Sequence, residues 1–145
     1  MIYRTNSQTE TARLAKEFAK SLKPGDVIAL YGGLGAGKTA FVRGLAEGLG
    51  LDPREVSSPT FALINEYPGR NITLCHFDMY RVEGEDSLES TGYFDYLNRK
   101  DCILAVEWSE NIEEHLPPRH IVVMIRKGEQ ENQRIIEIQE RVNNP

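Results

Sequence analysis

The chain has 145 residues, of which 40% are hydrophobic and 27% are charged, and its formal net charge is −5 at pH 7. This length suits one domain, residues 1–145, with a single hydrophobic core. An acidic chain without a run of lysines and arginines lacks the positive charge that neutralises a phosphate backbone, so unaided binding to nucleic acid is not expected.

Two further features bear on the compartment. No apolar run approaches the length of a membrane span, and the N-terminus has no basic segment followed by an apolar one, so we expect a cytoplasmic protein. Cys75 and Cys102 lack the close spacing of a zinc or redox motif. We therefore expect both residues to be buried free thiols.

The N-terminal elements are a strand and a helix. Residues 2–5 can form a short strand, and residues 7–22 carry apolar side chains at helical spacing. Ser7 and Glu10 have the spacing of a capping box at the start of this helix. Thr11 lies in the first turn, where hydroxyl side chains are typical of helix starts, although its hydroxyl could also contact a base or ribose.

A glycine-rich loop follows the apolar run of residues 27–31, which predicts a buried parallel strand. Residues 32–39 read GGLGAGKT and match the pattern G-x-x-x-x-G-K-[ST], in which backbone N–H groups cradle phosphates. Lys38 is placed to reach the β- and γ-phosphates, and the Thr39 hydroxyl is placed to ligate Mg²⁺. A helix predicted over residues 38–49 would hold the triphosphate at its positive N-terminus. The expected nucleotide contacts are Gly33, Leu34, Gly35, Ala36, Gly37, Lys38, Thr39 and Ala40.

The middle of the chain predicts a hairpin and short helices. Residues 57–67 and 72–77 alternate in polarity across a Pro-Gly turn, which predicts an antiparallel hairpin inserted beside the nucleotide. Residues 86–97 are broken at Gly92 and predict one or two short helices. A short helix over residues 110–116 and strands over residues 121–125 and 134–138 complete the chain.

Glu107 ends the second continuous apolar run, residues 102–106. A carboxylate at the C-terminal end of a buried parallel strand lies beside the phosphates in such folds and holds magnesium directly or through water. We therefore interpret Glu107 as a magnesium ligand together with Thr39. The alternative is that Glu107 only ends a strand at the surface.

Asp78 and His76 end the predicted hairpin. Asp78 lies between Phe77 and Met79, so its carboxylate needs magnesium, a water or Arg81 to compensate its charge. It could orient the water that attacks the γ-phosphate, or it could form an Asp–Arg pair that shapes a loop. His76 has no partner at ligand spacing and is interpreted as a packed or hydrogen-bonded histidine.

Residues 98–101, with the sequence NRKD, help to predict whether the nucleotide is ATP or GTP. They differ from the guanine-reading N-K-x-D at the second position, and they precede a strand, whereas the base-reading loop of a GTPase follows one. A solvated charged turn is the better interpretation, so ATP is favoured.

Four blocks of the sequence together resemble the bacterial TsaE (YjeE) family, the small ATPase needed for threonylcarbamoyladenosine modification of tRNA. The glycine loop alone is generic, but the four blocks occur in the family's order and spacing and span most of the chain. The blocks are LGAGKT at residues 34–39, SPTF at residues 58–61, HFDMYR at residues 76–81 and VEW at residues 106–108.

The resemblance implies one P-loop NTPase-like α/β domain, with a mainly parallel sheet, helices on both faces and antiparallel hairpins. It also implies binding of ATP and Mg²⁺ and assembly with the TsaB and TsaD proteins. In that complex the transferase chemistry belongs to TsaD, the ATPase cycles or resets it, and tRNA is reached only indirectly through the complex.

The same resemblance gives roles to individual residues. Lys38 and the loop amides would hold the phosphates, Thr39 and Glu107 would ligate Mg²⁺, and Asp78 would be required for hydrolysis. The remaining assignments are Trp108 beside the nucleotide, Thr60 in the switch-like loop as a contact to the γ-phosphate or its water, and Thr11 on the adenine side.

Two positions depart from the family pattern. Ala40 stands where the family often has Thr, which removes a hydroxyl near the phosphates, and Gly33 stands where Asp is common. Both departures affect individual phosphate contacts and leave the pattern of the loop unchanged.

We therefore expect a Mg²⁺-dependent ATPase of tRNA modification that is weak alone and is stimulated when its partners order residues 58–61. One alternative is a small-molecule kinase, which needs an acceptor pocket and usually a basic lid, for which the sequence offers no arginine cluster. The other alternative is a nucleotide-dependent assembly module that needs no turnover.

Overall fold

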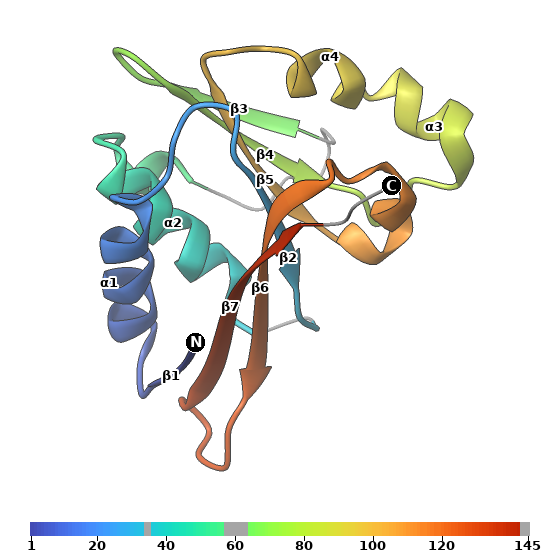
Figure 1. The fold of residues 1–145 in the computed structure, drawn as a ribbon. Coiled ribbons are helices and arrows are strands. Elements are labelled where there is room, and N and C mark those ends of the chain that lie inside the picture. Colours follow the sequence, from blue (N-terminus) through green and yellow to red (C-terminus); the bar gives the residue numbers. More distant parts are fainter. Residues whose placement is uncertain (34–35, 57–63, 143–145) are drawn as a thin grey trace.

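The computed structural model describes residues 1–33, 36–56 and 64–142. Its strands form a seven-stranded sheet in the order β1-β7-β6-β2-β5-β4-β3 (Figure 1). The strands are β1 (Ile2–Thr5), β2 (Val27–Tyr31), β3 (Ile64–Pro68), β4 (Thr73–Asp78), β5 (Cys102–Glu107), β6 (Arg119–Lys127) and β7 (Arg134–Val142). The α-helices are α1 (Gln8–Ala19), α2 (Lys38–Gly48), α3 (Gly84–Ser90) and α4 (Tyr93–Leu97), and the 3-10 helices are η1 (Pro53–Glu55) and η2 (Ser109–His115).

The centre of the sheet is parallel and its flanks are antiparallel. β6, β2, β5 and β4 pair in parallel, whereas β1 and β7, β7 and β6, and β4 and β3 pair antiparallel. All residues of β5 are buried, and so are the first four of β2, as expected for parallel strands covered on both faces. This architecture confirms the predicted α/β fold with a parallel centre and antiparallel hairpins.

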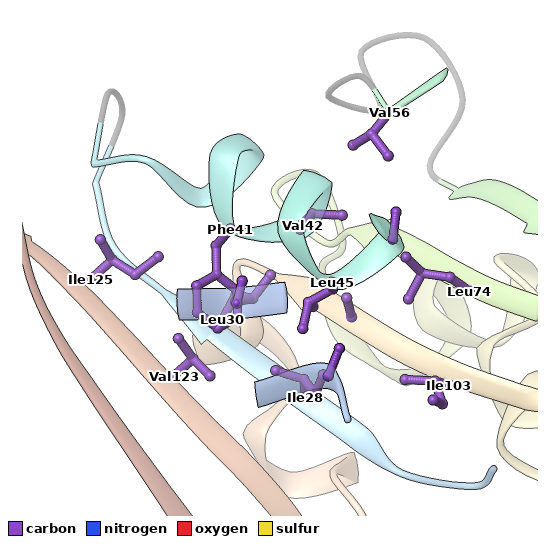
Figure 2. Close-up of a cluster of buried hydrophobic side chains, with 14 of the residues drawn as sticks. Ile28, Leu30, Phe41, Val42, Leu45, Val56, Leu74, Ile103, Val123 and Ile125 are labelled. Carbon is purple, nitrogen blue, oxygen red and sulfur yellow. The ribbon is translucent and has the colours of Figure 1, made fainter. Parts of the chain in front are cut away.

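Helices cover both faces of the sheet, with α1 and α2 on one side and α3, α4 and η2 on the other (Figure 1). Alternate residues of each central strand therefore enter different cores. On the α2 side, Phe41, Val42 and Leu45 pack over strand residues such as Ile28 and Leu30 (Figure 2). The second core combines the opposite strand faces with the C-terminal helices, through Cys75, Phe77, Leu104, Val106, Leu88, Tyr93 and Ile112.

Several local predictions are confirmed. Ser7 caps α1 by accepting a hydrogen bond from the Glu10 N–H at 3.1 Å, and Gly92 separates α3 from α4 with a φ of +83°. Cys75 and Cys102 are buried free thiols whose sulfur atoms lie 3.6 Å apart. In the described part of the chain, no helix has the length and hydropathy needed to cross a bilayer.

The predicted hairpin is confirmed where the structure describes it, and its second strand also pairs with a strand outside the hairpin. β3 and β4 pair antiparallel, while the predicted residues 57–63 lie outside the described residues. β4 is also a central strand, because it pairs in parallel with the whole of β5. The sequence alternation did not reveal this second pairing, and the last two strands are also longer than predicted.

Candidate nucleotide site

The carboxyl ends of three parallel strands meet at one edge of the sheet. The register pairs Glu107 of β5 with Leu30 of β2 on one side and with Asp78 of β4 on the other. α2 begins near this edge with Lys38, directly after the glycine-rich loop. In open α/β sheets ligands bind outside the carboxyl ends of the strands, so this edge is the candidate site.

The glycine loop needs glycine at Gly32, where the backbone of β6 approaches closely, and at Gly37, whose backbone is left-handed. At Gly32 a Cβ atom would lie 2.7 Å from the Ile125 carbonyl oxygen of β6, so only glycine fits without a shift. Gly37 caps the start of α2 with a φ of +106°, and its carbonyl accepts the Phe41 N–H at 3.1 Å. The predicted contacts Leu34 and Gly35 lie outside the described residues.

The Glu107 carboxylate pairs with the side chains of Lys38 and His76 inside the protein. Its Oε1 lies 3.5 Å from Lys38 Nζ, and its Oε2 lies 2.5 Å from His76 Nε2. Lys38 and Glu107 are only 8% and 6% exposed, and His76 is fully buried. Burial by itself raises the pKa of the Glu107 carboxyl, but the hydrogen bond to His76 and the charge of Lys38 outweigh it, so this pKa lies below its usual value.

His76 was interpreted from the sequence as a packed or hydrogen-bonded histidine, and this prediction is confirmed. Its link to Glu107 was not foreseen, because the sequence does not give the register between β4 and β5. The other ring nitrogen, Nδ1, is buried without a hydrogen-bond partner. Among the described residues, the His76 side chain therefore hydrogen-bonds through Nε2, where it orients the carboxylate.

Trp108 follows Glu107 in a strained backbone conformation. Among the described residues it is the one non-glycine with a positive φ, at +58°. Its ring lies 5.1 Å from Lys38 Nζ and 4.8 Å from the ring of Tyr80. This places the Trp108 ring beside the lysine of the glycine loop, consistent with its predicted place next to the nucleotide.

Asp78 is half-buried at the end of β4. Its Oδ1 accepts the backbone N–H of Tyr80 at 2.9 Å, and within the described residues it makes no ion pair with Arg81. Asn111 donates to the carbonyls of Met79 and Tyr80 and so fixes the segment that follows. The Asp–Arg pair is therefore not formed among the described residues, and the role of Asp78 in hydrolysis stays a prediction.

The remaining predicted residues differ in how they are placed. Thr39 is half-buried in the first turn of α2, and Ala40, the next residue, is buried. Thr11 is 1% exposed and its hydroxyl lies 2.7 Å from that of Thr5, so its contact with a nucleotide stays a prediction. Thr60 lies outside the described residues.

The donor set suits a hard cation. Thr39 offers a hydroxyl oxygen and Glu107 a carboxylate, and the described residues hold no cluster of three or more His, Cys, Asp or Glu that could bind a metal ion. Mg²⁺ is commonly bound by one or two carboxylates together with substrate phosphates, so a dedicated protein cage is not needed. These residues fit Mg²⁺ that arrives with a nucleotide.

The family comparison agrees with this geometry. The family model "Threonylcarbamoyl adenosine biosynthesis protein TsaE" matches residues 5–136. The chain belongs to the TsaE family. The resemblance drawn from the four sequence blocks is thereby confirmed.

Individual TsaE relatives cover most of the chain. The tRNA threonylcarbamoyladenosine biosynthesis protein TsaE of Bacillus subtilis is 44% identical over 126 residues, 87% of this chain and 77% of the relative. The TsaE of Aquifex aeolicus is 47% identical over 105 residues, 72% of this chain and 73% of the relative. A crystal structure of YdiB from Bacillus subtilis superposes with a TM-score of 0.75 at 37% identity, covering 99% of this chain and 86% of that one.

Proposed function

We propose that this TsaE-family protein binds ATP with Mg²⁺ and hydrolyses it as an accessory factor in threonylcarbamoyladenosine modification of tRNA. Family membership supports the pathway. The nucleotide chemistry is supported mainly by one observation, the Lys38–Glu107 pair buried at the N-terminus of α2. A glycine loop, a lysine and a carboxylate at the end of a parallel strand are the parts that P-loop NTPases use to hold a triphosphate.

Each side chain has a role in this proposal. Lys38 leaves Glu107 to neutralise the β- and γ-phosphates, and the loop amides with the N-terminus of α2 hold the remaining charge. Thr39 and Glu107 would supply oxygens to Mg²⁺, which would neutralise part of the negative charge of the phosphates. Asp78, which faces Glu107 across the register, orients the attacking water.

The family resemblance supports TsaB and TsaD as partners and the cytoplasm as the compartment. The net charge of −5 favours action through protein partners over direct binding of tRNA. In this proposal turnover is slow in the isolated protein and faster with TsaB and TsaD. Equal rates of ATP hydrolysis with and without the partners would contradict the stimulation.

Isothermal titration with ATP, ADP and GTP in the presence of Mg²⁺ tests the binding step. We expect the wild type to bind ATP and the Lys38→Ala variant to lose at least about tenfold in affinity, because a charge-assisted contact to phosphate is removed. Lys23→Ala, an exposed lysine outside the site, is the matched control. Undiminished binding by Lys38→Ala would overturn the proposal.

The Asp78→Ala variant separates an ATPase from an assembly module. The ATPase proposal expects this variant to bind ATP and partners but not to support tRNA modification in a reconstituted reaction. Asp86→Ala, at an exposed position of α3, should behave as wild type. Full modification by Asp78→Ala would favour a module that needs no turnover, and phosphate transferred to an added acceptor would favour a kinase.

A further inference from the structure

An arginine from the other end of the chain reaches the glycine loop. Arg134 is the first residue of β7, and its Nε donates to the Ala36 carbonyl oxygen at 2.9 Å. The two residues are 98 positions apart in the sequence. Arg134 is half-buried, and a Cβ atom on Gly37 would lie 3.8 Å from the same Nε. The guanidinium therefore lies against the loop just before α2 begins.

The backbone of Arg134 is paired with a strand on each side, and its side chain is also bonded to the hairpin turn. The register pairs Arg134 with Thr5 of β1 and with Lys127 of β6. Its Nη1 also donates to the carbonyl oxygens of Glu131 and Gln133, at 2.8 and 2.9 Å, within the turn of the β6–β7 hairpin. One planar guanidinium thus connects the hairpin turn to the glycine loop, and its fork geometry holds these groups in a defined orientation.

The carbonyl that Arg134 holds determines where a neighbouring amide points. The Ala36 carbonyl and the Gly37 N–H belong to one planar, trans peptide unit, so they point in opposite directions. Anchoring the carbonyl on the hairpin side directs the Gly37 N–H to the other side. In a phosphate loop the inward N–H groups bind the phosphates, and each outward carbonyl needs a donor.

We propose that Arg134 is a positioning residue of the nucleotide site, which holds the Ala36–Gly37 peptide in the orientation that binds phosphate. The β6–β7 hairpin then becomes part of the site, although it does not touch the reacting atoms. This inference rests on the proposed function, because it concerns the binding of the same triphosphate. Arg134 is one feature of the site that the sequence analysis did not identify.

Two variants and one control test the proposal. Arg134→Gln removes the charge and the fork, Arg134→Lys keeps a charged donor without the fork, and Arg126→Gln removes an exposed arginine on β6 of the same hairpin. Affinity for Mg²⁺ with ATP and with ADP is measured by isothermal titration. ATP turnover at saturating ATP and thermal unfolding without nucleotide are measured on the same samples.

We expect Arg134→Gln to bind ATP and ADP about tenfold more weakly, the loss typical of one hydrogen bond from a charged donor. Arg134→Lys should recover part of that loss, and Arg126→Gln should match the wild type. Turnover at saturating ATP should change little, so the effect appears in KM and not in kcat, and thermal unfolding shows whether each variant is folded. If Arg134→Gln fails to fold, weaker binding by a folded Arg134→Lys supports the same conclusion.

Two results would overturn this inference alone. In the first, the wild type binds ATP and Arg134→Gln, or Arg134→Lys where Arg134→Gln does not fold, binds it equally well. In the second, kcat falls while affinity is unchanged, which would make Arg134 a contact to the transferred phosphate. A wild type that captures no ATP is a different result, because it would overturn the proposed function itself.

Discussion

The site is built around one buried carboxylate with two partners. Transfer of a charge from water into a protein interior is costly unless the charge is paired and hydrogen-bonded. Glu107 meets this condition through Lys38 on one oxygen and His76 on the other. The same pairing engages both oxygens of Glu107, so in the proposed function the binding of ATP with Mg²⁺ would exchange the partners around this carboxylate.

Replacement of this carboxylate tests its part in stability. Glu107→Gln leaves Lys38 and His76 without a negative partner, and we expect the free energy of unfolding to fall by about 2 kcal/mol. Urea unfolding at pH 7 without nucleotide measures the change. Glu110→Gln, an exposed glutamate three residues further on, is the control and should have little effect. Equal stability of the two variants would contradict a structural role of the buried pair.

The fluorescence of Trp108 can report the proposed movement of Lys38 from Glu107 to the phosphates. It is the single tryptophan of the chain, and its ring lies 5.1 Å from Lys38 Nζ. We expect ATP to draw the ammonium toward the phosphates, which changes the surroundings of the indole and therefore its emission. Fluorescence titration with ATP and Mg²⁺ measures the change, and Lys38→Ala should show none. Constant emission in a wild type that binds ATP by calorimetry would contradict the exchange.

At the scale of elements, α1 and α2 cross at very close range. A Cβ atom on Gly44 would lie 2.1 Å from the Ala12 carbonyl oxygen, and one on Gly48 would lie 2.5 Å from the Lys16 carbonyl oxygen. Both glycines lie in α2, where glycine is otherwise unfavourable by about 1 kcal/mol relative to alanine. Their cost is offset by the close packing of the two helices, which fixes the position of α2 over the sheet.

Addition of one methyl group to this contact should be destabilising. Gly44→Ala improves helix propensity, but the clash with the α1 backbone forces the helices apart, and we expect a net loss of about 1–3 kcal/mol in the free energy of unfolding. Chemical denaturation measures the loss. Glu47→Ala, on the exposed side of the same helix, changes a surface ion pair and should cost less than about 1 kcal/mol. A Gly44→Ala variant more stable than the wild type would contradict the close crossing.

The elements themselves were largely predictable, because their signals are local. The apolar runs before Lys38 and Glu107 predicted buried parallel strands, and the Ser7 cap predicted the start of a helix. The link of His76 to Glu107 depends on the register between β4 and β5, which no local pattern encodes. The bond from Arg134 to Ala36 depends on the path of the whole chain, so no local pattern in the sequence predicts it.

At the scale of the whole molecule, one sheet separates two cores and presents the site at its edge. Residues that alternate along the central strands supply both cores, so a shift of register by one residue would move side chains shaped for one core into the other. This constraint holds Asp78 and Glu107 side by side at the end of adjacent strands. The relative positions of the site residues therefore depend on the packing of both faces of the sheet.

The charge of the whole chain leads to a prediction about tRNA. Proteins that bind nucleic acid directly release counterions through clustered lysines and arginines, and their affinity falls steeply with salt. Here 22 acidic residues outnumber 17 lysines and arginines. We expect the isolated protein to show no tRNA binding tighter than about 10 µM at physiological salt, the weaker part of the non-specific range.

Filter binding at low and at physiological salt, with and without the partner proteins, measures this affinity. Under the proposed function, association that appears only with TsaB and TsaD is expected, because those proteins would then supply the positive surface. Binding by the isolated chain that weakens by orders of magnitude between the two salt conditions would contradict the prediction. That result would require a local basic surface strong enough to overcome the net charge of −5, and the tRNA would then contact this protein directly.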